Sequence, residues 1–196
     1  LERKGTAHAV MQAREVIADC EENVLVLCGD AHFMNADTIK AALELHKDKN
    51  NDVTVITAIV PDATGYGRII RTADGISGIV EHKDATKEQL EIREINSGAY
   101  WFKAKTLSEI LDSFDCNNSQ GEYYLTDTID VLKNQGKGVG CFEVSDPDEI
   151  LGVNTKLELC QVDKIMRMKI NSRHALNGVY FQNIENTFIG PDVEIE

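Results

Sequence analysis

The stretch Val24-Leu25-Val26-Leu27-Cys28-Gly29-Asp30, the first part of VLVLCGDAHFM (24–34), decides the fold. Its apolar run is continuous rather than alternating, as in a strand of a parallel sheet that is covered on both faces. The run stops at Gly29 and Asp30, and open α/β sheets bind ligands at the carboxyl ends of their strands. Asp30 is therefore a candidate functional carboxylate, although an ordinary surface turn also ends a strand in this way.

The segments on either side predict an α/β domain. NADTIKAALELHKDKN (35–50) predicts a helix with Asn35 as its N-cap, and DVTVITAIV (52–60) predicts a second buried strand. Strand, helix and strand in this order favour a right-handed parallel unit. Further elements are expected as a helix over 7–19, short antiparallel strands between Pro61 and 103, helices over 104–114 and 123–134, a strand over 138–144 and a helix over 154–169.

The sequence divides into two predicted domains, 1–170 and 171–196. The second segment holds Phe188, Ile189, Val193 and Ile195 around a Gly-Pro-Asp turn. This pattern suggests the first coil of a β-solenoid, but one coil cannot establish a period, so a frayed hairpin is an open alternative.

Composition excludes several classes of protein. The chain has 196 residues, of which 42% are hydrophobic, and a net charge of -13 from 20 basic and 33 acidic residues. This charge argues against a nucleic-acid footprint and against docking on an anionic membrane. No apolar run approaches the roughly 18 residues of a membrane span. The five cysteines form no C-x-x-C pair, which argues against a zinc site or a disulfide framework and favours the cytoplasm.

Asp30 and Asn154 form a candidate magnesium site. A carboxylate at a strand end suits Mg²⁺, which usually takes one or two protein oxygens and completes its octahedron with water and phosphate. Asn154, in GVNTK, offers an amide oxygen at a predicted helix start. An N-cap asparagine is also common without any metal.

Other polar or glycine-rich positions are candidate ligand contacts, each with a structural alternative. Gly5 and Thr6 open a helix, where free N-H groups favour an anion or a uracil edge, but Thr6 also fits a simple cap. Gly67 lacks a side chain and lets a ligand approach the backbone, or it serves a tight turn. Glu81 and Asn96 can bond sugar hydroxyls or can be exposed strand residues.

The motifs together resemble a known family, bacterial N-acetylglucosamine-1-phosphate uridyltransferase, the nucleotidyltransferase half of a bifunctional enzyme that also acetylates glucosamine-1-phosphate. The matching stretches occur in the family's order from Gly5 to about 159. They are GTAHAVMQA (5–13), Gly29-Asp30, ATGYGRIIR (63–71), IVEHKDATKEQ (79–89), EINSGAY (94–100), NNSQGEYYLTD (117–127) and GVNTKLEL (152–159).

The resemblance implies a fold, a reaction and a role for each candidate residue. The fold is a Rossmann-like nucleotidyltransferase (nucleotide-diphospho-sugar transferase) fold with a mixed sheet, followed by the start of a left-handed β-helix. The reaction transfers UMP from UTP to N-acetylglucosamine-1-phosphate and gives UDP-N-acetylglucosamine, a cell-envelope precursor, and pyrophosphate. The resemblance implies that Gly5 and Thr6 contact the uracil. It implies that Asp30 and Asn154 bind Mg²⁺ and that Asn154 also contacts the substrate. The sugar is implied to contact Gly67, Glu81 and Asn96.

Several departures from the family shape the expectations. The family's glycine-rich loop should precede Leu1, so the sequence is expected to be a fragment that is inactive alone, from a parent enzyme that forms a homotrimer. Cys28 replaces the family's usual tyrosine, and Ala31-His32-Phe33 replaces its Val-Pro-Leu. Two alternatives are a non-catalytic homologue that binds nucleotide sugars and a nucleotidyltransferase for another sugar phosphate.

Overall fold

The structure is a computed structural model that describes residues 4–31, 34–153 and 155–195. The chain forms two compact units, Leu1–Ile150 and Leu151–Glu196. Helix α7 (Lys156–Leu176) runs through residue 170, where the sequence places the boundary between two domains. The boundary between the two predicted domains at 170 stays a prediction.

The first unit is a mixed α/β structure built on a six-stranded sheet. Its strands are β1 (Asn23–Val26), β2 (Val53–Ile59), β3 (Arg68–Thr72), β4 (Gly75–Val80), β5 (Glu94–Lys103) and β6 (Val139–Glu143). Its helices are α1 (Thr6–Met11), α2 (Arg14–Ala18), α3 (Ala36–Asp48), α4 (Lys87–Leu90), α5 (Ala104–Ile110) and α6 (Thr128–Asn134), with 3-10 turns at Leu125–Asp127 and Pro147–Ile150.

Strand β5 is the centre of the sheet. The order is β4-β3-β5-β2-β6, and β1 also pairs with β5. Both β1 and β2 run antiparallel to β5, so they are parallel to each other with β5 between them, while β2 and β6 are parallel neighbours. The expected strand-helix-strand unit is therefore present, but a strand from far along the chain separates its two strands.

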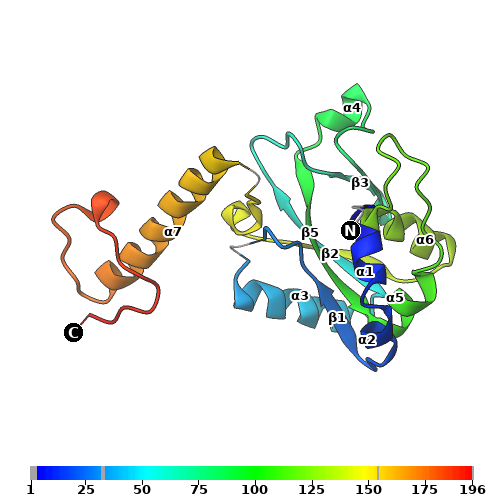
Figure 1. The fold of residues 1–196 in the computed structure, drawn as a ribbon, viewed down its shortest axis with the longest axis horizontal. Helices are drawn as coiled ribbons and strands as arrows, with labels where there is room; N and C mark the ends of the chain where they lie inside the picture. The colour runs from blue at the N-terminus through cyan, green and yellow to red at the C-terminus, as the bar shows by residue number, and fades with distance from the viewer. Residues whose placement is uncertain (1–3, 32–33, 154, 196) are drawn as a thin grey trace. The chain divides into compact units, whose positions relative to one another are not determined.

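Helices cover both faces of this sheet, as Figure 1 shows. One core lies between the sheet and α1, α2, α5 and α6, and it includes Ala7, Ile17, Leu107, Ile110 and Ile129. The other core lies toward α3 and includes Ala42, Ile56, Ala58 and Ile95. The two-sided cover explains why β2 is buried over six of its seven residues.

Local elements differ from the sequence expectations in two places and agree in a third. The predicted helix over 7–19 is two short helices, because the chain turns at Gln12 and Ala13. Strand β1 is only partly buried along its length, although its sequence suggests burial on both faces. Asn35 caps α3 as predicted, since its Oδ1 accepts a hydrogen bond from the backbone N-H of Asp37 at 2.9 Å.

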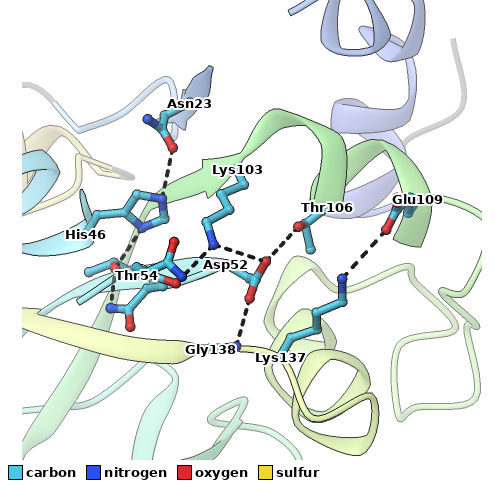
Figure 2. Close-up of polar contacts among 11 residues, drawn as sticks. Asn23, His46, Asp52, Thr54, Lys103, Thr106, Glu109, Lys137 and Gly138 are labelled. Atoms are coloured by element: carbon cyan, nitrogen blue, oxygen red, sulfur yellow. Dashed lines mark hydrogen bonds and ion pairs between the residues drawn. The ribbon is translucent and has the colours of Figure 1, made fainter. Parts of the chain in front are cut away.

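A buried polar network ties the sheet to α3 at the start of β2 (Figure 2). His46 of α3 is 1% exposed, with Nδ1 2.9 Å from Thr54 Oγ1 and Nε2 3.1 Å from Asn23 Oδ1. Beside it, Asp52 accepts hydrogen bonds from Thr106 Oγ1 and from the backbone N-H of Gly138, both at 2.8 Å. The network thus links β1, β2, α3, α5 and the start of β6.

The second unit consists of α7 and the segment that folds back on it. Thr155 and Glu158 form a capping box at the start of α7. Asn171 Nδ2 donates hydrogen bonds to the carbonyls of Ile184 and Thr187, and the Arg167 guanidinium lies 4.3 Å from the centroid of the Phe188 ring. Within the described part of 171–196 the structure assigns no strand, so the first β-solenoid coil stays a prediction.

Among the described residues, none of the helices combines the length and the apolar character that crossing a membrane requires.

Candidate functional site

Gly67, Glu81 and Asn96 meet at one place, although they are spread over 30 positions of sequence. The backbone N-H of Asn96 donates to the Gly67 carbonyl at 2.9 Å. A Cβ built on Gly67 would lie 3.4 Å from Glu81 Oε2 and 3.6 Å from Asn96 Cβ. We call these three residues the Gly67 cluster. The structure thus brings together the three residues for which the family resemblance implies contact with the sugar, while their roles in sugar binding stay predictions.

The Glu81 carboxylate follows β4 and is anchored by Thr126. Thr126 is buried, and its Oγ1 donates a hydrogen bond to Glu81 Oε1 at 3.2 Å. Burial raises the pKa of Glu81; the Thr126 hydrogen bond opposes that increase and the charge of Asp84 adds to it. The carboxylate is thus held in one orientation and still has Oε2 beside Gly67.

Asn96 is fixed by an irregularity of β5. Residues 97–99 all lie opposite the single residue Ile56 of β2, because the pairing shifts between Val55 and Thr57. Gly98 adopts a φ of 76°, and its N-H donates to Asn96 Oδ1 at 3.0 Å. Such bulges often re-aim a side chain beside a functional site. The amide of Asn96 therefore has a fixed orientation.

Cys28 and Asp30 border the Gly67 cluster. The Cys28 thiol donates to the Gly98 carbonyl at 3.4 Å, and a Cβ on Gly98 would lie only 2.6 Å from Cys28 Sγ. Burial raises the pKa of the Cys28 thiol, and the charges of Asp30 and Glu81 raise it further. The turn that carries Asp30 is thus close to the cluster, as its place at a strand end suggests.

Tyr100 lies beneath the same group of side chains. It is 2% exposed and stacks on Phe102, with 5.7 Å between the ring centroids. Burial raises its pKa well above the usual value and the Glu81 charge adds to this effect, whereas a hydrogen bond with Asn96 lowers it. The phenol therefore stays protonated and holds the Asn96 amide through their hydrogen bond.

The structure gives Gly5 and Thr6 a structural role. Gly5 has a φ of 103°, and a Cβ there would lie 2.4 Å from the backbone oxygen of Tyr123. Thr6 Oγ1 accepts a hydrogen bond from the backbone N-H of Leu125 at 3.0 Å, and the N-H of Ala7 donates to the Tyr123 carbonyl. These contacts dock the start of α1 on 123–125, and uracil contact by the two residues stays a prediction.

Asn154, the second predicted magnesium ligand, lies outside the described residues. In the described ranges, no group of three or more histidine, cysteine, aspartate or glutamate side chains is arranged to hold a metal ion. This finding leaves the predicted pair of one carboxylate and one amide untested.

Sequence reasoning missed Thr126, Tyr100 and Asp127 as neighbours of the cluster. Burial, together with the charges of Asp115 and Asp130, raises the pKa of Asp127 to about 6. Thr126 and Asp127 end NNSQGEYYLTD, whose density of polar side chains was the available signal. Part of that density is local capping, since Asn118 Oδ1 accepts the backbone N-H groups of Gln120 and Glu122.

The family follows from a comparison with known proteins. Residues 1–147 match the family model described as nucleotidyl transferase. The chain belongs to this family. It is 47% identical over 192 residues to the bifunctional protein GlmU of Acetivibrio thermocellus, an alignment that covers 97% of the chain and 42% of that relative. It is 48% identical over 196 residues to GlmU of Clostridium novyi, covering all of the chain and 43% of the relative.

The chain thus spans less than half the length of these curated relatives. A solved structure from Bacillus anthracis, described as a glucose-1-phosphate thymidylyltransferase in complex with sucrose, matches with a TM-score of 0.61. That alignment covers 95% of the chain and 67% of the solved one at 19% identity, so it shows the fold alone. A nucleotidyltransferase fold with a mixed sheet was predicted from the sequence and is confirmed.

Proposed function

We propose that this nucleotidyl transferase transfers UMP from UTP to N-acetylglucosamine-1-phosphate, giving UDP-N-acetylglucosamine and pyrophosphate. The observation that carries the proposal is the meeting of Gly67, Glu81 and Asn96 at one place. These are the positions for which the resemblance implies contact with the sugar. The identity of about 47% to bifunctional GlmU proteins supports the same substrates.

Each member of the Gly67 cluster suits a sugar ligand. Glu81 offers a carboxylate that accepts hydrogen bonds from hydroxyl groups, and Asn96 offers N-H donors because Gly98 already occupies its Oδ1. Gly67 leaves the space that a methyl group would otherwise fill between them. A carboxylate and an amide beside a backbone without a side chain together can orient a hydroxylated ring.

Asp30 suits a magnesium ion. A carboxylate is a hard oxygen donor of the kind that Mg²⁺ prefers, and Asp30 is partly buried in the turn that follows the first strand. Asp30 and Asn154 would hold the ion, which neutralises phosphate charge when it is bound. We propose this pair from the sequence alone, since Asn154 lies outside the described residues.

The reaction itself requires positioning more than covalent help. An oxygen of the sugar phosphate attacks the α-phosphorus of UTP in line, the bond from that phosphorus to the bridging oxygen breaks, and pyrophosphate leaves. The chain contributes by orienting the sugar through Glu81 and Asn96, so that the attacking phosphate faces the nucleotide. Gly5 and Thr6 are proposed to contact the uracil from the start of α1.

The test is pyrophosphate release from UTP and N-acetylglucosamine-1-phosphate with Mg²⁺, measured with the protein at its full natural length. We expect Asp30→Asn to lower turnover by at least about 100-fold, the order of loss that follows removal of one preorganised electrostatic group. The matched control is Asp74→Asn, an exposed carboxylate in the turn between β3 and β4.

The outcomes separate the proposal from its alternatives. Faster turnover with glucose-1-phosphate or another sugar phosphate would replace the proposed acceptor. Binding of UDP-N-acetylglucosamine without turnover would identify a binding protein instead of an enzyme. Equal turnover by Asp30→Asn and Asp74→Asn would remove Asp30 from the proposed metal site.

A further inference from the structure

The bulge of β5 leaves several backbone groups without strand partners, and side chains supply the missing hydrogen bonds. Ser97 Oγ donates to the Ile56 carbonyl at 2.7 Å and accepts the Ala99 N-H at 3.2 Å. Asn96 Oδ1 accepts the Gly98 N-H, and the Cys28 thiol donates to the Gly98 carbonyl. Buried backbone groups need such partners, because each unpaired one costs about as much as a lost hydrogen bond.

Ser97 is the residue on which the shape of the bulge depends. Its hydroxyl is both donor and acceptor, and it bridges the opposite strand to Ala99, the last residue before the pairing of β5 with β2 resumes at Tyr100. Gly98 lies between Ser97 and Ala99 in a left-handed conformation, with a φ of 76°. The position of the Gly98 N-H, and with it the orientation of the Asn96 amide, therefore follows from the Ser97 bridge.

We propose that Ser97 is a positioning residue that orients Asn96 for recognition of the sugar phosphate, which rests on the proposed function. Ser97 itself touches no member of the Gly67 cluster except its chain neighbour Asn96. Because Gly98 holds Oδ1, the Asn96 amide presents N-H donors to a hydroxyl or carbonyl oxygen of the sugar. Loss of the bridge displaces the Gly98 N-H from Asn96 Oδ1 and leaves the amide held only by its hydrogen bond with Tyr100, so the amide can turn away from the orientation that faces the sugar.

Three variants distinguish a role of Ser97 in positioning Asn96 from a role in the stability of the fold alone. Ser97→Ala removes the bridge, and Ser97→Thr keeps a hydroxyl on the same carbon. Ser77→Ala is the matched control, because Ser77 Oγ also donates to a carbonyl of a neighbouring strand, that of Ile70, at 3.3 Å, and Ser77 lies in a separate irregularity, between β3 and β4.

Two measurements are made on the protein at its full natural length. In ligand-free protein, NMR hydrogen exchange at the Gly98 amide should become at least about tenfold faster in Ser97→Ala and stay unchanged in Ser77→Ala. In the turnover assay, Ser97→Ala should raise KM for N-acetylglucosamine-1-phosphate about three- to tenfold, the factor that a hydrogen bond of ordinary strength carries. The KM for UTP should not change, and Ser97→Thr should restore both readouts.

The inference and the proposed function fail in different ways. Unchanged Gly98 exchange in Ser97→Ala would overturn the positioning role whether or not the protein is active. Equal increases in KM for both substrates would also overturn it, because they indicate general loss of structure. Wild-type protein without turnover refutes the proposed function, and the part of Ser97 in sugar recognition is then wrong even if the exchange result holds.

Discussion

Acid is expected to destabilise the first unit through His46. The imidazole lies in the network of Figure 2, 1% exposed, between Thr54 and Asn23. Asn23 Oδ1 accepts from Nε2-H, and Nδ1 then accepts from the Thr54 hydroxyl, whose oxygen already accepts a hydrogen bond from Asn51 Nδ2 at 2.9 Å. Every bond is thus made with a neutral ring. Burial lowers the pKa of His46 from 6.5 to about 4, and the nearby Lys103 charge contributes in the same direction.

The lowered pKa fixes the sign and size of the effect. Between pH 6.5 and pH 4 the unfolded chain binds a proton at His46 that the folded protein does not, so stability falls as the pH falls. Each pH unit costs about 1.4 kcal/mol, which gives roughly 3 kcal/mol over the interval from 6.5 to 4. The free energy of unfolding of a typical domain is about 5–15 kcal/mol, so the loss at His46 is a large fraction of it.

Urea unfolding of wild-type protein and of His46→Gln, at several pH values from 7.5 to 4.5, measures this effect. Glutamine carries no titrating proton, so the difference in unfolding free energy between the two proteins should change by about 1.4 kcal/mol per unit below pH 6.5. Asp127, with a raised pKa of about 6, acts in the opposite direction, but it is common to both proteins and cancels. Parallel curves for the two proteins would refute the assignment of acid sensitivity to His46.

Three further substitutions test the site. Gly67→Ala should raise KM for the sugar phosphate and cost about 1 kcal/mol of stability or less, because its Cβ meets only the tip of Ile79 closely, at 3.2 Å; an unchanged KM would count against the cluster as a sugar site. Asn96→Asp retains an acceptor for the Gly98 N-H but loses the amide donors, so KM for the sugar phosphate should rise about tenfold, and the melting temperature should fall because a second carboxylate lies beside the buried Glu81. Gly5→Ala should lower the unfolding free energy by at least about 2 kcal/mol, because its Cβ would collide with the Tyr123 backbone in a left-handed conformation; calorimetry that finds no change would disprove this packing argument.

The candidate site was predictable from sequence only in part. Gly67, Glu81 and Asn96 were named from their residue types and the family resemblance, and they do converge. Thr126 was not singled out, because a threonine within a polar turn gives no sign that it holds a carboxylate 45 positions away. The structural role of Gly5 was likewise hidden, since it depends on the approach of a backbone more than a hundred residues downstream.

Local chemistry in the sequence determined much of this protein by itself. The segment of β2 was predicted to be a buried strand and is buried over six of its seven residues, and Asn35 caps α3 through the nearby N-H of Asp37. Such features depend on neighbours within a few positions, so the chain order alone reveals them. The motifs within 5–159 indicated the family because each of them is a short stretch of consecutive residues.

Pairing between strands that are far apart in the sequence determined the strand order and the geometry of the site. Only the tertiary structure places β5 between β1 and β2, because the sequence of a strand does not specify which partner it pairs with. That placement creates the bulge opposite Ile56, and the bulge joins Asn96 to Ser97 and Gly98, which the sequence did not single out, in one hydrogen-bonded unit. The sequence supplied the side chains of the site, and the packing of distant strands determined which of their atoms face one another.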